Sequence, residues 1–269
     1  MYYLEESREE RELNNIEVHT KRGITGSTLK LIALAAMLID HVGAVILEPI
    51  IINNSMTYSG LTGIAKLYTI DQVMRLTIGR IAFPIYCFLL IEGFQKTSNR
   101  YRYAGRLLLF AIVSEIPFDL ALADTWLSTN YQNVFFTLFL GLAVMIGVEK
   151  VKLCNVNKWI TGILDIGILF VGMLIADLLC TDYGGYGVLC ITVLYLFRGN
   201  RKRQILAGSI AFVGGDYLCH GSLSELLAPL GFVPISFYNG ERGLKLKYIF
   251  YLFYPLHLLV LYGVRILIL

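Results

Sequence analysis

The sequence predicts an all-α integral membrane protein, a polytopic bundle of about nine transmembrane helices, and three observations support that fold class. Hydrophobic residues make up 56% of the 269 residues, whereas charged residues make up 16% and leave a net charge of only +3. Apolar stretches near the roughly 20 residues that a helix needs to cross a bilayer recur along the chain. Lysine and arginine gather between these stretches. This composition argues against a soluble domain and against a nucleic-acid-binding protein.

The first 27 residues differ from the rest because they are polar and charged. They contain no apolar core of the kind found in signal peptides. We expect residues 1–27 to form a cytoplasmic tail, helical in its Glu/Arg-rich part. Residues 28–269 are then predicted to form one transmembrane domain, with no low-complexity linker and no internal repeat.

Nine apolar stretches are predicted to be spans. They lie at about 28–50, 76–95, 104–123, 133–149, 159–180, 184–198, 203–220, 223–238 and 246–267. The sixth, seventh and eighth are short for a helix that crosses about 30 Å of hydrocarbon. Eight spans with one re-entrant segment is therefore the alternative.

The basic clusters predict the orientation. Under the positive-inside rule, short loops rich in lysine and arginine stay in the cytoplasm. Nine spans place all five clusters there, with the N-terminus inside and the C-terminus outside, whereas eight spans would leave the last cluster outside. The external connections are then about 51–75, 124–132, 181–183 and 219–222. The clusters are Lys21–Arg22–Lys30, Lys96–Arg100–Arg102–Arg106, Lys150–Lys152–Lys158, Arg198–Arg201–Lys202–Arg203 and Arg242–Lys245–Lys247.

The five cysteines show neither CxxC spacing nor a Cys/His pattern typical of metal sites. We therefore expect no bound metal and no disulfide framework. The cysteines are interpreted as small apolar residues in or near the spans.

The first span carries two ionisable residues, Asp40 and His41, and each costs a few kcal/mol within the bilayer unless it faces a cavity or a partner. At about 100° per residue, neighbours on a helix point to different sides. Asp40 is predicted to face another span and to form a structural ion pair with Arg80. His41 titrates near neutrality, which suits a general base or a proton carrier. The stripe of Asp40 also holds the small residues Ala33, Ala36 and Gly43, which permit close helix packing.

Further polar residues occur at the same predicted depth on other spans. Glu115 and Asp119 are four residues apart in the third span and share a helix face, and Asn133 opens the fourth span. Together with Asp40, His41 and Arg80, they predict a solvated cavity in the outer half of the bundle. Two more residues are candidates for substrate or cofactor binding, namely Tyr183 at the start of the sixth span and His257 in the last, although a core histidine is the simpler interpretation of His257.

Five blocks of the sequence, in order, resemble the TraX family, which takes its name from the conjugative-plasmid protein that N-acetylates F pilin. The resemblance covers about residues 28–269. That family is similar to the membrane-bound acyltransferases of the acyltransferase-3 type, which take an acyl group from a cytoplasmic thioester, usually acetyl-CoA. The blocks are "LKLIALAAMLIDHVG", "GRIAFPIYCFLLIEGF", "RYRYAGRLLLFAIVSEIPFDLAL", "NVFFTLFLG" and "YNGERGLKLKYIFYLFYPLHLLVL".

The resemblance implies roles for individual residues. His41 matches the histidine of the family's first-span Asp-His pair and would be the catalytic one, with Asp40 as its neighbour. Arg80 matches the arginine of the Gly-Arg-x-x-x-Pro block. The resemblance further assigns Glu115 and Asp119 to the acids of the third-span block and His257 to the histidine of the Tyr-Pro-Leu-His block. Nothing in the sequence specifies a pilin, so a protein N-terminus, a cell-envelope sugar and a small amine all remain acceptors.

The resulting hypothesis is a multi-pass enzyme of the bacterial inner membrane that moves an acetyl group from acetyl-CoA to an amine or hydroxyl. His41 would act as general base, with Glu115 or Asp119 orienting it. Arg80 or Asn133 would stabilise the oxyanion. The phosphates of CoA would bind a cytoplasmic basic cluster, for which we select Arg100, Arg102 and Arg106.

Two other classes of function use the same residues. In a proton-coupled transporter, the carboxylates and His41 would form a proton relay. The missing two-fold repeat and the odd span count argue against that class. In a non-catalytic assembly factor, the polar group would tolerate isosteric changes such as Asp119→Asn. From residue chemistry alone, enzyme and transporter stand nearly level, and the resemblance favours the enzyme.

Overall fold

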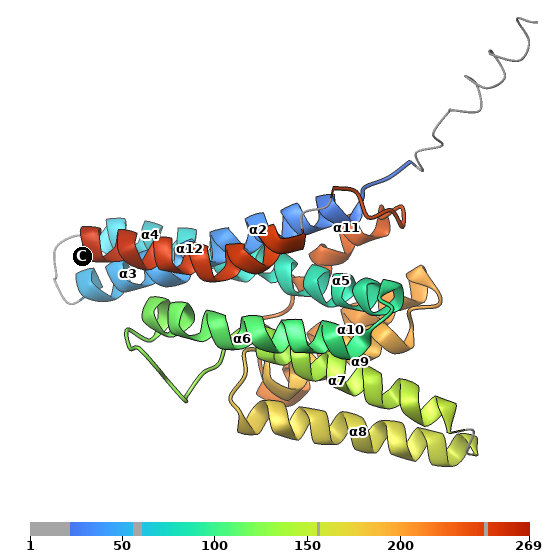
Figure 1. Ribbon diagram of the computed structural model, residues 1–269. Helices are drawn as coiled ribbons and strands as arrows, with labels where there is room; N and C mark the ends of the chain where they lie inside the picture. Colours follow the sequence, from blue (N-terminus) through green and yellow to red (C-terminus); the bar gives the residue numbers. More distant parts are fainter. Residues whose placement is uncertain (1–21, 56–60, 155–156, 245–246) are drawn as a thin grey trace, which may run out of the picture.

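The computed structural model describes residues 22–55, 61–154, 157–244 and 247–269, and every regular element within them is a helix. The all-α prediction is confirmed for this part of the chain. Most of the predicted tail, residues 1–21, lies outside the described residues. The long helices run roughly side by side, with α2 and α12 together at one edge and α8 at the other (Figure 1).

Two long, nearly continuous helical rods begin the domain. The first consists of α2 (Gly26–Val42), the π-helix η1 (Gly43–Leu47) and α3 (Glu48–Ser55). The second consists of α4 (Leu61–Val73), the π-helix η2 (Met74–Ile78), the 3₁₀ turn η3 (Gly79–Ile81) and α5 (Ala82–Lys96). Thr25 caps α2 by accepting a hydrogen bond from the Thr28 backbone N–H at 3.3 Å.

The connection predicted at 51–75 is wrong for most of its length. Helix α3 continues to Ser55, and α4 is already helical from Leu61. The physical reason is the lack of a stop signal. No proline occurs between residues 50 and 75, and the one glycine in the helical part, Gly63, lies in the first turn of α4, where it does not interrupt the helix.

The middle of the chain forms five helices at the predicted positions. They are α6 (Arg100–Leu122), α7 (Val134–Leu153), α8 (Lys158–Leu178), α9 (Gly184–Leu196) and α10 (Arg201–His220). Four of them start at an asparagine whose side-chain oxygen accepts a backbone N–H of the first turn, which is a strongly preferred N-cap. These caps are Asn99, Asn133, Asn157 and Asn200.

The predicted eighth span, 223–238, is not a single helix. It contains only the 3₁₀ turn η4 (Ala228–Gly231) and the short helix α11 (Phe232–Ser236). Pro229 and Pro234 interrupt regular helix formation. Gly231 lies against the backbone of the second rod, where an added Cβ would come within 2.8 Å of the Ile81 carbonyl oxygen. Helix α12 (Lys247–Ile268) completes the chain and packs against α6 and α2.

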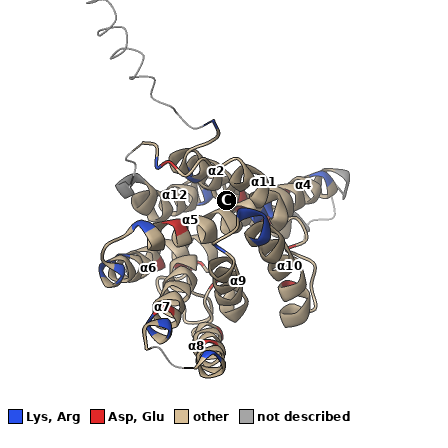
Figure 2. Ribbon diagram, turned by 90° about the vertical axis from the view of Figure 1, so that its right-hand side faces the viewer, with Lys and Arg blue, Asp and Glu red and all other residues tan. Residues whose placement is uncertain are grey.

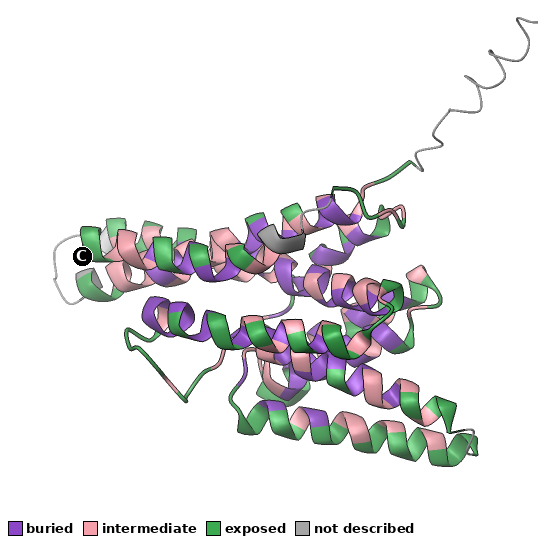
Figure 3. Ribbon diagram, in the orientation of Figure 1, coloured by how far each residue is buried: buried purple, intermediate pink, exposed green. Residues whose placement is uncertain are grey.

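Among the described residues, five helices are long and apolar enough to cross a membrane. They are Gly26–Asn53, Gly63–Lys96, Val134–Leu153, Lys158–Leu178 and Phe250–Ile268. With this many apolar helices, the protein is a membrane protein. Burial is uneven across it, because α8 exposes most of its surface whereas α5, α7 and α9 hold much of the interior (Figure 3).

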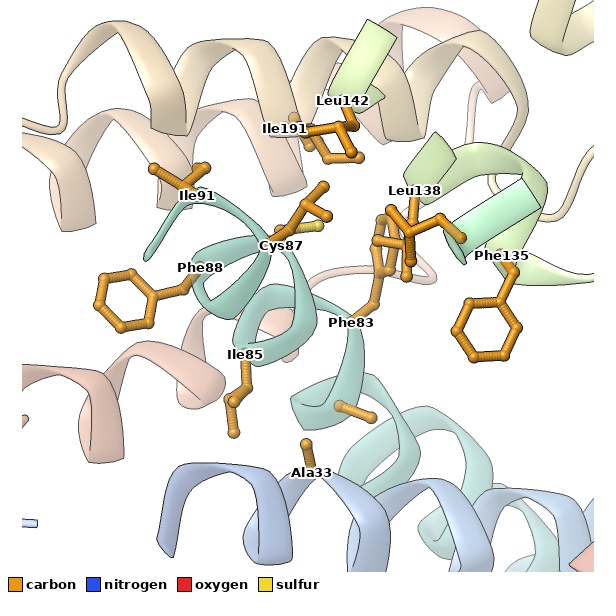
Figure 4. Close-up of a cluster of buried hydrophobic side chains, with 14 of the residues drawn as sticks. Ala33, Phe83, Ile85, Cys87, Phe88, Ile91, Phe135, Leu138, Leu142 and Ile191 are labelled. Carbon is orange, nitrogen blue, oxygen red and sulfur yellow. The ribbon is translucent and has the colours of Figure 1, made fainter. Parts of the chain in front are cut away.

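Helix α5 lies at the centre of the core. Phe83, Ile85 and Cys87 point from it toward α2 on one side and α7 and α9 on the other (Figure 4). Lipid tails are as apolar as these side chains, so close packing and interhelical polar contacts hold such a core together more than the hydrophobic effect does. The arrangement fixes the position of α2, which carries the candidate residues Asp40 and His41, against α5.

Candidate active site

Two histidines from opposite ends of the chain meet where α12 packs on α2. The Nδ1 atom of His41 lies 2.6 Å from the Nε2 atom of His257. Their ring planes are inclined by only 22°, with centroids 4.9 Å apart, as an in-plane hydrogen bond between the two rings requires. The other ring nitrogen of His257, Nδ1, lies 2.8 Å from the Phe253 carbonyl oxygen. His257, which the sequence placed only in the middle of the last span, is thus the hydrogen-bond partner of His41.

Tyr254 adjoins the histidine pair. Its ring stands edge-on to His41 and to His257, with centroid distances of 6.0 and 5.7 Å, and the residue is only 3% exposed. Tyr254 was not among the residues predicted from the sequence. The available signal was its position three residues before His257, because residues three apart share a helix face.

The backbone beside His41 is irregular. The π-helix η1 starts two residues after His41, and η2 precedes Arg80 on the neighbouring rod. Single π-turns are rare and are frequent at functional sites. The two π segments lie in close contact, because an added Cβ at Gly43 would come within 2.8 Å of both Arg75 Cγ and Asp71 Oδ1.

Asp40 points away from His41, as the helical geometry predicts. Its carboxylate packs on Gly79, where an added Cβ would overlap it. Among the described residues, the direct ion-pair partner of Arg80 is Glu225, to which its guanidinium donates at 2.7 Å, and not Asp40 as expected, although the charges of Asp40 and Arg80 still attract each other. The broken segment after α10 brings Glu225 to this position. Because the sequence predicted one regular span at 223–238, Glu225 was not predicted as the partner of Arg80.

Glu115 and Asn133 together cap the start of α7. The side-chain amide of Asn133 donates to the Ala111 carbonyl at 2.8 Å and to the Glu115 carboxylate. Its oxygen accepts the Phe135 backbone N–H at 3.0 Å. Both amide hydrogens of Asn133 are therefore engaged, which leaves none for a substrate oxyanion.

Asp119 holds the connection between α6 and α7. Its carboxylate accepts the Ser128 backbone N–H at 2.7 Å. The hydrogen bonds described for His41 involve neither Asp119 nor Glu115. The two acids lie in the C-terminal half of α6, where their described contacts are structural.

A cavity of about 360 Å³, here called the basic cavity, opens between the ends of four elements. Its mouth carries Lys30 of α2, Lys96 of α5, Arg106 of α6 and Arg242 of the connection before α12. Lys and Arg mark several helix ends on this side of the molecule (Figure 2). Three of the five basic clusters therefore contribute to one mouth.

The basic cavity extends toward the histidine pair. Met37 and Tyr254 line it, together with the aromatic residues Tyr86, Tyr103, Phe135 and Tyr251. From Lys30 to Met37 is about 10 Å along the helix, and His41 is one turn further on. Of the predicted phosphate ligands, only Arg106 lines this cavity. Arg100 pairs with Glu149 at 3.4 Å, and Arg102 is exposed.

A second cavity, here called the acidic cavity, has a volume of about 350 Å³ and lies at the other ends of the helices. The ends of α8 and α10, the connection before α9 and residues 224–225 line it. Its acids are Asp177, Asp182, Asp216 and Glu225, with Arg80 beside them. Tyr131 donates to Asp182 at 2.5 Å, and burial raises the pKa of Asp182 to about 6.

Tyr183, a predicted ligand-binding residue, also lines the acidic cavity. Its backbone is left-handed, with φ at 63°, and its ring stacks on Phe83 with centroids 3.7 Å apart. Among the described residues, no group of three or more His, Cys, Asp or Glu side chains is placed to hold a metal ion.

A comparison with known protein families shows to which family the chain belongs. The family model described as "TraX protein" matches residues 25–265. The chain belongs to the TraX family. The matched region of this TraX-family chain contains both cavities and the histidine pair.

One curated relative supports the same assignment. The chain is 31% identical over 254 residues to the "Probable fimbrial assembly protein FimC, serogroup H1" of Dichelobacter nodosus. The match covers 87% of this chain and 92% of the relative. No solved structure matches this TraX-family protein.

Proposed function

We propose that this TraX-family protein is an acetyltransferase of the bacterial inner membrane, which moves an acetyl group from acetyl-CoA to an amine or hydroxyl acceptor. One observation carries the proposal. The basic cavity joins a mouth with four cationic side chains to residues that adjoin the His41–His257 pair. A donor with an anionic head and a thioester at the end of a long arm suits such a cavity.

The proposed orientation follows from the charges at the helix ends. The basic mouth would face the cytoplasm, where acetyl-CoA is found, and the acidic cavity would face the other side. The chain would cross nine times, with residues 222–238 as a broken crossing. The two ends of this segment lie at the two ends of α5. Glu225 pairs with Arg80, just before α5 begins, whereas Tyr238 accepts a hydrogen bond at 2.9 Å from Lys96, the last residue of α5.

Lys30, Arg106 and Arg242 would bind the phosphates of the donor, whereas Lys96 is engaged with Glu92, Tyr238 and the Gly240 carbonyl. Guanidinium groups bind phosphates through paired hydrogen bonds, and lysine acts as a point charge. The aromatic walls leave an apolar path for the pantetheine arm. Its thioester carbonyl would then lie beside Tyr254.

His41 is the proposed general base. It would take the proton from the acceptor N–H or O–H while that atom attacks the thioester carbonyl carbon. The C–S bond then breaks, and His41 returns the proton to the leaving thiolate, so that acid and base steps balance. A positioned base of this kind contributes roughly 10² to 10⁴ in rate.

Tyr254 is the proposed donor to the oxyanion. Its phenol O–H can donate a hydrogen bond, and Tyr254 lines the basic cavity beside His41. Arg80 and Asn133, which the sequence favoured for this role, are engaged with Glu225 and with the start of α7. The acceptor would enter through the acidic cavity, and the name of the fimbrial relative makes the N-terminus of a pilin-type subunit one acceptor to test.

The test is transfer without a membrane gradient. The purified protein in detergent, with labelled acetyl-CoA and membranes of the source cell type as acceptor, should yield a labelled product. Mass spectrometry of that product distinguishes a protein N-terminus from a sugar. A protein that moves protons or solutes across vesicles but acetylates nothing under these conditions would instead support the proton-coupled transporter.

A further inference from the structure

We infer that His257 is a positioning residue, which fixes the tautomer of His41 and leaves the Nε2 atom of His41 as the reactive nitrogen. The inference rests on the proposed function for its catalytic meaning. Its structural part rests on two hydrogen bonds. These bonds connect the backbone of α12 to the ring on α2.

The first bond determines the tautomer of His257. A backbone carbonyl oxygen only accepts hydrogen bonds, so the 2.8 Å contact with Phe253 requires the hydrogen on Nδ1 of His257. A neutral imidazole carries one ring hydrogen. The Nε2 atom of His257 therefore presents a lone pair.

The second bond transmits that choice to His41. Because Nε2 of His257 only accepts, the 2.6 Å contact requires a hydrogen on Nδ1 of His41. The Nε2 atom of His41 is then left with a lone pair, which is what a general base needs. Both rings carry their hydrogen on Nδ1, and one carbonyl of α12 determines the tautomer of both.

The pair also suits a membrane interior. When Nε2 of His41 takes a proton, the bond from its Nδ1–H to His257 becomes charge-assisted and strengthens. A carboxylate in the place of His257 would do the same but would bury a second charge, which is costly to desolvate. Glu115 and Asp119, the acids expected to orient His41, are engaged with Asn133 and Ser128.

The direct test is spectroscopic. The protein is labelled with ¹⁵N-histidine, reconstituted in lipid nanodiscs at neutral pH, and its ring nitrogens are measured by solid-state NMR. His41→Gln and His257→Gln assign the signals by removing them. We expect both rings to carry hydrogen on Nδ1 and none on Nε2. A hydrogen on Nε2 of either neutral ring would overturn the inference.

Two substitutions test the catalytic part. His257→Leu removes the acceptor and should lower kcat by about 10²-fold, the cost of a misplaced catalytic group, with KM for acetyl-CoA unchanged. His257→Gln keeps an oxygen that accepts from Nδ1–H of His41 and should recover most of kcat. An unchanged kcat in well-folded His257→Leu would overturn the positioning role.

The two proposals fail separately. If the wild-type protein shows both Nδ1–H tautomers but no acetyl transfer, the hydrogen-bond chain stands and the acetyltransferase proposal is wrong. If transfer occurs and depends on His41, but His257→Leu matches the wild type, the enzyme proposal stands and the positioning role is wrong.

Discussion

The two cavities have nearly equal volumes, about 360 and 350 Å³, but opposite charge. Counted over the described residues, the basic cavity has four cationic side chains and one acid, Glu92, whereas the acidic cavity has four acids and one arginine. Clefts lined by one sign of charge concentrate ligands of the other sign. Under the proposed function, this difference would let an anionic donor and a cationic acceptor approach from opposite ends of the bundle.

The largest effect is expected from a substitution of His41, which lies in the catalytic centre and in neither charged entrance. His41→Gln keeps a polar side chain of similar length but removes the base, so we expect kcat to fall by roughly 10²- to 10⁴-fold. Binding of acetyl-CoA should stay unchanged because the basic mouth is intact. Transfer assays and equilibrium binding on the same preparation check both parts. Transfer at the wild-type rate would remove His41 from the mechanism.

Tyr254→Phe should have the next largest effect. It removes one hydroxyl and keeps the ring beside the two histidines, so packing is preserved. Loss of one oxyanion donor costs about 10²- to 10³-fold in kcat. The matched control is Tyr262→Phe, which removes a hydroxyl from the same helix about two turns away. Equal losses in the two variants would contradict the role of Tyr254.

Substitutions at the basic mouth should change KM for acetyl-CoA. Lys30→Gln and Arg242→Gln each remove one charge from the basic mouth and should raise KM for acetyl-CoA about tenfold, within the range of one charged hydrogen bond. Arg102→Gln is the control, because Arg102 is exposed and does not line the cavity. A rise in KM for Arg102→Gln that equals the other two would mean that diffuse surface charge binds the donor.

The smallest expected effect concerns the close contact behind the centre. Gly79→Ala places a methyl group on the Asp40 carboxylate and should lower the free energy of unfolding by about 1–3 kcal/mol, as overpacking does. Gly105→Ala on α6 is the control, since nothing lies within 4 Å of its added Cβ. Thermal unfolding in detergent compares them. Equal stability would show that Asp40 has room to move.

Local helical geometry was predictable from the sequence, and long-range pairing was not. The 100° step between Asp40 and His41 predicted that their side chains point in different directions. The apolar stretches predicted most of the helices. The partner of His41 is 216 residues away, and no periodicity reports such a contact. Glu225 reaches Arg80 because α10 ends at His220 and the chain turns back after the left-handed Gly221, and the resulting contact depends on tertiary packing.

The most direct test of the account is a structure of the protein in nanodiscs with acetyl-CoA, by cryo-electron microscopy. The account predicts density that starts between Lys30 and Arg242 and ends beside Tyr254, with the acidic cavity free of donor. Density for the donor in the acidic cavity, or a basic cavity that stays empty at saturating acetyl-CoA, would contradict it.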